Sequence, residues 1–89
     1  MIVRIMTEGQ YRISDDAMAV LHHLDEELLE AMLHDAKDKF YGLLGQALTL
    51  VREGAMVPTE ELVQSDVVLP AEDITFDEAK KIFHDTGLA

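Results

Sequence analysis

The chain has 89 residues and no cysteine, so its length allows one domain and its composition excludes disulfides and thiolate metal sites. Its net charge of −11, from 18 acidic and 7 basic residues, repels nucleic-acid phosphates and anionic lipids. We therefore expect a single domain over residues 1–89 that binds no nucleic acid and does not insert into a membrane.

The N-terminal residues lack the basic and apolar regions of a signal peptide, and no apolar run is long enough to span a bilayer. The absence of cysteine also fits a reducing compartment. These features predict a cytoplasmic location.

Residues 1–13 are expected to form a β-hairpin around a short turn at residues 7–9, where Gly9 can adopt a positive φ. Apolar and polar residues alternate along both strands, which places one apolar face on the core. The predicted cross-strand pairs are Val3 with Ile13, Arg4 with Arg12, Ile5 with Tyr11 and Met6 with Gln10.

Two long helices follow, over residues 15–34 and 36–53, each with apolar residues at steps of three and four. Ser14 and Asp35 are the expected N-caps, and Gly54 is the expected C-terminal glycine. The short link between the helices predicts an antiparallel helical hairpin.

Gly42 and Gly45 lie inside the second helix, although glycine costs about 1 kcal/mol relative to alanine there. A close crossing of the two helices would explain them, and so would a contact with a partner or a second copy. The sequence leaves these alternatives open, and with them the oligomeric state.

Residues 55–74 form a connector in which Val67–Leu69 is a possible short third strand. Thr75 and Glu78 form a capping box that opens a helix over residues 76–85. The predicted fold class is therefore α+β, with an N-terminal hairpin packed on a helical hairpin. Whether the connector is ordered without a partner is left open.

No catalytic residue, metal ligand or cofactor is predicted. The pairs His22/Glu26 and His23/Glu27 have ligand spacing, but no third or fourth ligand accompanies them. Adjacent acids on a helix point in different directions, which makes them poor acid–base pairs. We therefore expect no enzyme; a metal- or ligand-dependent enzyme that uses the helix histidines is the alternative.

Arg4 and Arg12 are the unusual feature, because the predicted register places like charges side by side on the outer face of the hairpin. Nearby carboxylates would neutralise them in an acidic protein. Alternatively they present a protein-binding face, together with Gln10 and the apolar side chains beside it.

The first thirteen residues, and above all Glu8-Gly9-Gln10-Tyr11-Arg12, resemble the PspA-associated protein family (PspAA), small proteins of archaea and actinobacteria. The stretch 61–70 and the capped helix after Thr75 are similar as well. The sequence departs at Thr7, where many members have glycine, and at Gln64, where a proline often stands.

The resemblance implies a non-enzymatic accessory in a membrane-stress response that binds a PspA-type coiled-coil protein. No catalytic residues come with it. Our candidate contact residues are Arg4, Glu8, Gly9, Gln10, Tyr11 and Arg12. A self-assembling module with Gly42 and Gly45 at its interface is a further alternative, and the direction of any regulation is open.

Overall fold

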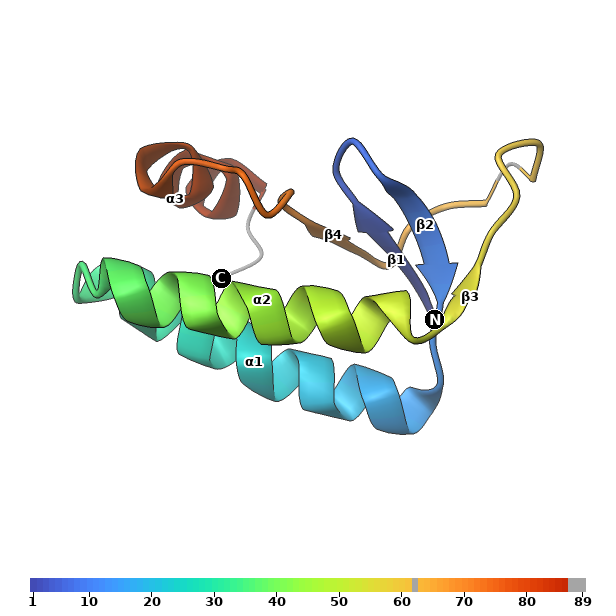
Figure 1. Cartoon of the computed structure of the whole chain (residues 1–89), viewed down its shortest axis with the longest axis horizontal. Coiled ribbons are helices and arrows are strands. Elements are labelled where there is room, and N and C mark those ends of the chain that lie inside the picture. Colours follow the sequence, from blue (N-terminus) through green and yellow to red (C-terminus); the bar gives the residue numbers. More distant parts are fainter. Residues whose placement is uncertain (62, 87–89) are drawn as a thin grey trace.

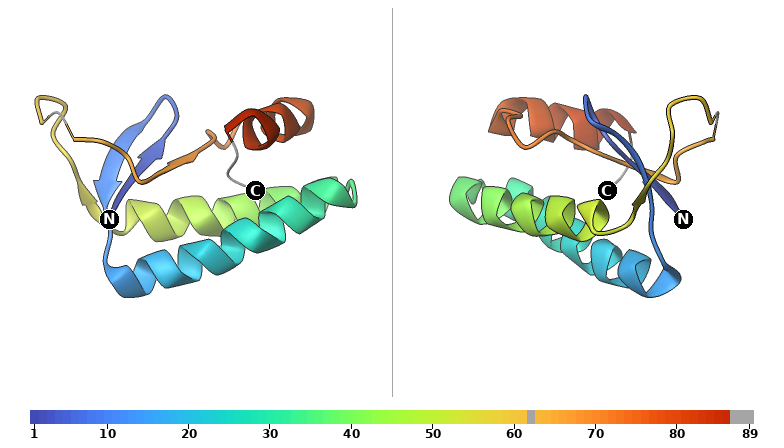
Figure 2. Two further views of the ribbon diagram at one scale, coloured as in Figure 1. Left: turned by 180° about the vertical axis from the view of Figure 1, so that it is seen from behind. Right: turned by 45° about the vertical axis from the view of Figure 1, so that its right-hand side comes forward.

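A computed structural model describes residues 1–61 and 63–86. The elements are β1 (Ile2–Ile5), β2 (Gly9–Arg12), α1 (Asp15–Leu33), α2 (Lys37–Arg52), β3 (Ala55–Met56), β4 (Val67–Leu69) and α3 (Phe76–Thr86). The antiparallel helices α1 and α2 run the length of the molecule, with the sheet over one end and α3 over the other (Figure 1). The view from behind shows the same arrangement (Figure 2). The predicted α+β class is confirmed.

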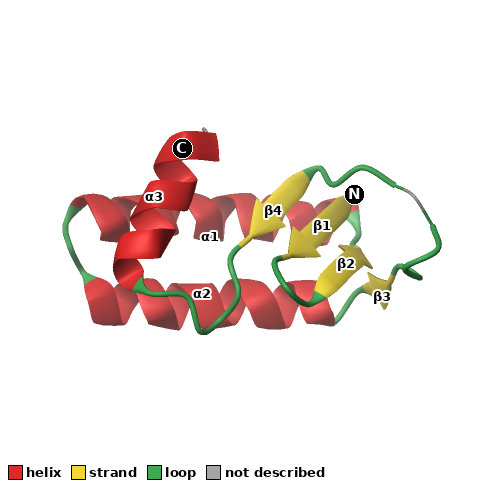
Figure 3. Cartoon of the chain, turned by 90° about the horizontal axis from the view of Figure 1, so that it is seen from above, coloured by secondary structure: helices red, strands yellow, loops and turns green. Residues whose placement is uncertain are grey.

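The sheet has the strand order β3-β2-β1-β4, in which β1 is antiparallel to β2 and parallel to β4 (Figure 3). The predicted third strand is thus present, at the edge beside β1. The two-residue strand β3 was not predicted, because Ala55 and Met56 are too short a segment to show any alternation.

The predicted hairpin register is wrong by two residues. Arg4 lies opposite Gln10 rather than Arg12, and Val3 lies opposite Tyr11. The physical reason is that the turn closes earlier than expected, over residues 6–8. The backbone N–H of Glu8 donates to the Ile5 carbonyl at 3.0 Å and Ile5 pairs with Gly9, so Met6 lies in the turn rather than in the hairpin ladder. A two-residue shift preserves the faces of both strands, and the apolar face still meets the helices.

The core lies between the sheet and the helical hairpin. Val3, Ile5 and Leu69 are buried on the inner face of the sheet. They belong to the same core cluster as Phe40 and Leu44 of α2. The apolar stripes of both helices supply most of the remaining core residues, and Tyr11, Ile13 and Ala79 complete the cluster.

Gly54 ends the α2 segment for a different reason from the one expected. A Cβ at this position would lie 2.5 Å from the Arg12 carbonyl oxygen and 2.9 Å from Ile13 Cγ2. Glycine is required here because β2 passes close by, and a positive φ is not involved.

The helix α3 is held against α2 by aromatic packing. The Phe40 and Phe76 ring centroids are 5.4 Å apart, and the Tyr41 hydroxyl donates to the Ile74 carbonyl at 2.6 Å. Asp35 does not cap α2 as predicted. It adopts a φ of 53° in the link between the helices and pairs with Lys80 of α3, while Ala36 takes the N-cap position.

Candidate protein-binding surface

The two arginines of the hairpin share the outer face of the sheet, although they are not cross-strand partners. Arg4 lies opposite Gln10 and Arg12 opposite Ile2, so both side chains project away from the helices. Both arginines are exposed. The structure therefore places them on one face, as expected. Arg12 lies opposite Ile2, two residues along β1 from Arg4, rather than opposite Arg4 itself.

The arginines differ in their surroundings. Arg12 Nη2 lies 3.4 Å from Glu61 Oε2, and both side chains are about half exposed, so the pair contributes little to stability. Among the described residues, no carboxylate lies within 4.0 Å of Arg4. Neutralisation by neighbours thus describes Arg12 but not Arg4.

A hollow of about 300 Å³ opens beside Arg4 on the outer face. The residues that line it include Arg4, Glu8, Gln10, Met56, Val57 and Glu61. Met56 is 62% exposed at the edge of this hollow. Arginine and methionine are both enriched in protein interfaces, so Arg4 and the exposed thioether of Met56 fit a protein contact.

Gln10 is not available for such a contact. Its side-chain nitrogen donates to the Val63 carbonyl at 3.1 Å and to Ser65 Oγ at 2.7 Å, and the residue is 9% exposed. The connector therefore covers part of the outer face that the sequence left open. Ile2 on the same face is also buried, at 8% exposure.

Glu8 and Tyr11 belong to a network that joins the hairpin to the end of α2. Arg52 donates to Glu8 through Nε at 3.0 Å and Nη2 at 2.6 Å, and the Tyr11 hydroxyl donates to Glu8 at 2.7 Å. The Arg52 bonds, and then the Tyr11 bond, lower the pKa of Glu8 from 4.5 to about 2. The same carboxylate raises the pKa of Tyr11.

Gly9 closes the turn with a φ of 139°, a conformation that other residues rarely adopt. The string Glu8–Arg12 is thus divided in its roles. Glu8, Gly9, Gln10 and Tyr11 have contacts or a backbone conformation that hold the hairpin in place, and Arg12 faces outward with Arg4.

Residues of the hollow outside the hairpin were missed by the sequence reasoning. Met56, Val57 and Glu61 reach it from β3 and the connector, which carry no periodic pattern. The only sequence signal is that Pro58 breaks this stretch, which indicates a loop but not its position.

The histidine pairs of α1 lie apart from this surface. His22, His23, Glu26 and Glu27 are all exposed. Within the part of the chain that the structure describes, no three His, Asp or Glu side chains form a group able to hold a metal ion. Nor does any described helix have the length and apolar character needed to cross a membrane.

Comparison with known proteins adds one finding. The model of the PspAA family, described as PspA-Associated protein, matches residues 1–89. No match is found among curated proteins or among solved structures.

Proposed function

The chain belongs to the PspA-associated protein family, and from this premise we propose that it is a non-enzymatic adaptor that binds a PspA-type coiled-coil protein. In this proposal it acts in the cytoplasm as part of a membrane-stress response and uses no cofactor. The family model matches the whole chain, and the family's description as PspA-associated supports a link to PspA.

Arg4 is the observation that favours a particular contact face. It is exposed, has no carboxylate within 4.0 Å among the described residues, and borders a hollow that includes Met56. An exposed guanidinium can bind a carboxylate in a bidentate manner, and arginine is enriched in protein interfaces. We propose that Arg4 and Arg12 contact the partner directly, whereas Glu8, Gly9, Gln10 and Tyr11 shape the hairpin that presents them.

Titration calorimetry against the purified PspA-type protein of the same organism tests this proposal. We expect saturable binding that weakens as salt is raised, because the contact involves charges. The double variant Arg4→Ala/Arg12→Ala should bind about tenfold more weakly or worse, which corresponds to about 1.4 kcal/mol.

A matched control is the double variant Lys37→Ala/Lys81→Ala, which removes two positive charges at exposed helical positions away from the hairpin. It should bind like the natural protein. If the natural protein gives no heat at low or high salt, the adaptor function is wrong. If it binds and the arginine variant binds equally well, only the contact face is wrong.

A further inference from the structure

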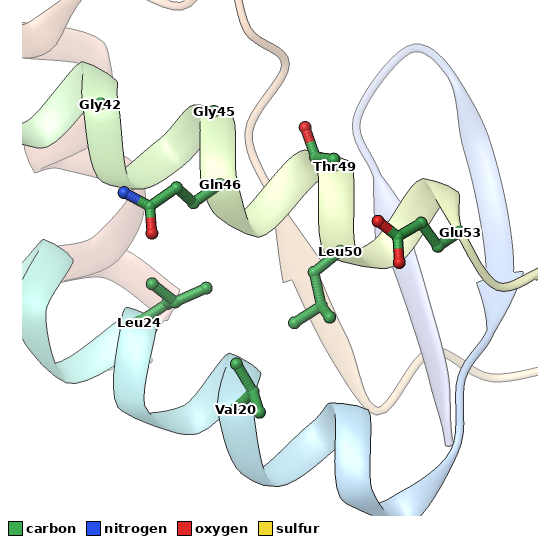
Figure 4. Close-up of a pocket in the computed structure, with 8 residues that line it drawn as sticks. All are labelled: Val20, Leu24, Gly42, Gly45, Gln46, Thr49, Leu50 and Glu53. Carbon is green, nitrogen blue, oxygen red and sulfur yellow. The ribbon is translucent and has the colours of Figure 1, made fainter.

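A second surface feature is an open groove of about 630 Å³ between α1 and α2 (Figure 4). Val20 and Leu24 line it from α1, and Gly42, Gly45 and Leu50 are among the residues that line it from α2. Glu53, the C-cap residue of α2, lines it as well. No strand contributes to the lining, and the groove shares no residue with the hollow beside Arg4. It is therefore a separate surface.

Gly42 and Gly45 have no role inside the described fold. A Cβ added at either position would meet no atom within 4 Å, so a close crossing of α1 and α2 does not require glycine. Each glycine nevertheless lowers helix stability by about 1 kcal/mol relative to alanine. Glycine allows another backbone to approach closely, which points to a contact from outside the chain.

Three apolar side chains line the groove beside the glycines, and Gln46, Thr49 and Glu53 add polar groups along its α2 side. Val20 is 51% exposed, and Leu24 and Leu50 are half-buried along its floor. Figure 4 shows these three side chains between the two helices, below the glycines. An open groove between two helices, with apolar side chains along it, can receive the apolar side of a third helix.

The charges around the groove indicate what kind of helix fits. The α1 segment contains six acidic residues and no lysine or arginine. Asp16, Val20, His23, Glu27 and Glu30 follow one another at steps of three and four, so they share one exposed stripe beside the groove. Glu53, just after α2, adds a further carboxylate. A second copy of this chain would bring a further net charge of −11 to this edge, whereas a basic helix would be attracted.

We propose that this groove docks an amphipathic α-helix of another protein, with small and apolar residues on its buried side and lysine or arginine along its flanks. The small residues face Gly42 and Gly45, the apolar ones cover Val20, and the basic ones meet the acidic stripe of α1. With the Arg4 surface on the sheet, the protein then has two independent contact surfaces and bridges two partners.

The test uses a designed 20-residue helical peptide with an alanine and leucine seam and lysine flanks, titrated into the ¹⁵N-labelled protein. We expect saturable NMR shift changes centred on Val20, Gly42 and Gly45, and weaker binding at high salt. The same peptide with glutamate in place of lysine should not bind.

Gly42→Leu and Gly45→Leu should each weaken binding about tenfold or more, because leucine fills the space that the peptide backbone needs. Both variants should remain folded, since leucine is the better helix former and meets no atom at its Cβ. His22→Leu places the same side chain at an exposed position of α1 outside the groove and should leave binding unchanged.

Three results would overturn the proposal. Shift changes scattered over the acidic surface would indicate non-specific attraction. Equal binding by the glycine variants would remove the groove from the contact. A dimer in sedimentation that dissociates in Gly42→Leu would assign the groove to a second copy of this chain.

Discussion

Thr7 at the hairpin tip has a φ of 70°, in the left-handed region that a β-branched residue rarely adopts. The same position is the one at which the family resemblance led us to expect glycine. Its conformation supplies the reason, because glycine has no Cβ to clash in this region. The turn therefore retains its geometry in this chain at some cost in stability.

Replacing Thr7 with glycine should stabilise the protein by about 0.5–1 kcal/mol. Relief of about 1–2 kcal/mol of left-handed strain exceeds the extra entropy of glycine in the unfolded chain. Urea denaturation measures the difference. Thr7→Ala keeps a Cβ and should give a smaller gain; a loss of stability in Thr7→Gly would mean that the threonine side chain makes a favourable contact.

Glu8 is the carboxylate most strongly stabilised in its charged form. Because its folded pKa is about 2 and its unfolded value 4.5, folding favours the ionised group. Its contribution to stability is complete above pH 4.5 and is lost as the pH falls from 4.5 towards about 2. The partner Arg52 stays charged throughout this range.

The variant Glu8→Gln should therefore be less stable than the natural protein at pH 7, with a difference that shrinks as the pH falls below 4.5. Urea unfolding at pH 7, 5, 4 and 3 gives this difference directly. Glu30→Gln removes an exposed α1 carboxylate as the control and should change the stability at pH 7 little. A difference that stays constant down to pH 3 would show that the Arg52 pair does not form in solution.

At the scale of the elements, two glycines in or next to α2 have opposite surroundings. Gly45 of α2 has open space around it, whereas Gly54 just after α2 lies against the β2 backbone. A Cβ at Gly54 would meet the Arg12 carbonyl oxygen, so glycine at this position allows the end of α2 to lie this close to the hairpin.

Gly45→Ala should raise the free energy of unfolding by about 1 kcal/mol through helix propensity alone. Gly54→Ala should lower it by about 1–3 kcal/mol, because backbone atoms must move to accept the new Cβ. Thermal unfolding of the two variants side by side makes each the control for the other. Equal effects of the same sign would contradict the packing at Gly54.

At the scale of the whole molecule, the excess of acids governs the response to salt. Arg12, Arg52 and Lys80 form ion pairs in the described part of the chain, but the 18 acidic residues far outnumber the 7 basic ones. Net repulsion therefore outweighs pairing in the folded state.

Raising NaCl from 0.02 to 0.3 M should increase Tm by several degrees, since a gain of about 1 kcal/mol corresponds to about 4–8 °C in a domain of this size. Calorimetric melting checks this. Glu27→Gln/Glu30→Gln, which removes two charges from the acidic stripe, should melt higher at low salt and respond less to added salt. A Tm that falls with salt would mean that the ion pairs dominate.

The sequence by itself determined which faces are buried and where α1 and α3 begin. Alternation placed Val3, Ile5 and Tyr11 on the core side, and Ser14 and Thr75 cap their helices as expected, with bonds of 3.1 Å to Ala17 N and to Glu78 N. These features depend on residues close together in the chain, which local patterns record.

Only the tertiary structure decided the register and the availability of the candidate site. Met6 bonds to the Leu69 carbonyl, Gln10 to Val63 and Ser65, and Glu8 to Arg52, all more than 40 residues away. Such bonds depend on which distant groups meet, and a periodic pattern is the same for registers that differ by two residues. For that reason the sequence identified Arg4 and Arg12 as outward-facing, but only the fold showed which of their neighbours remain accessible.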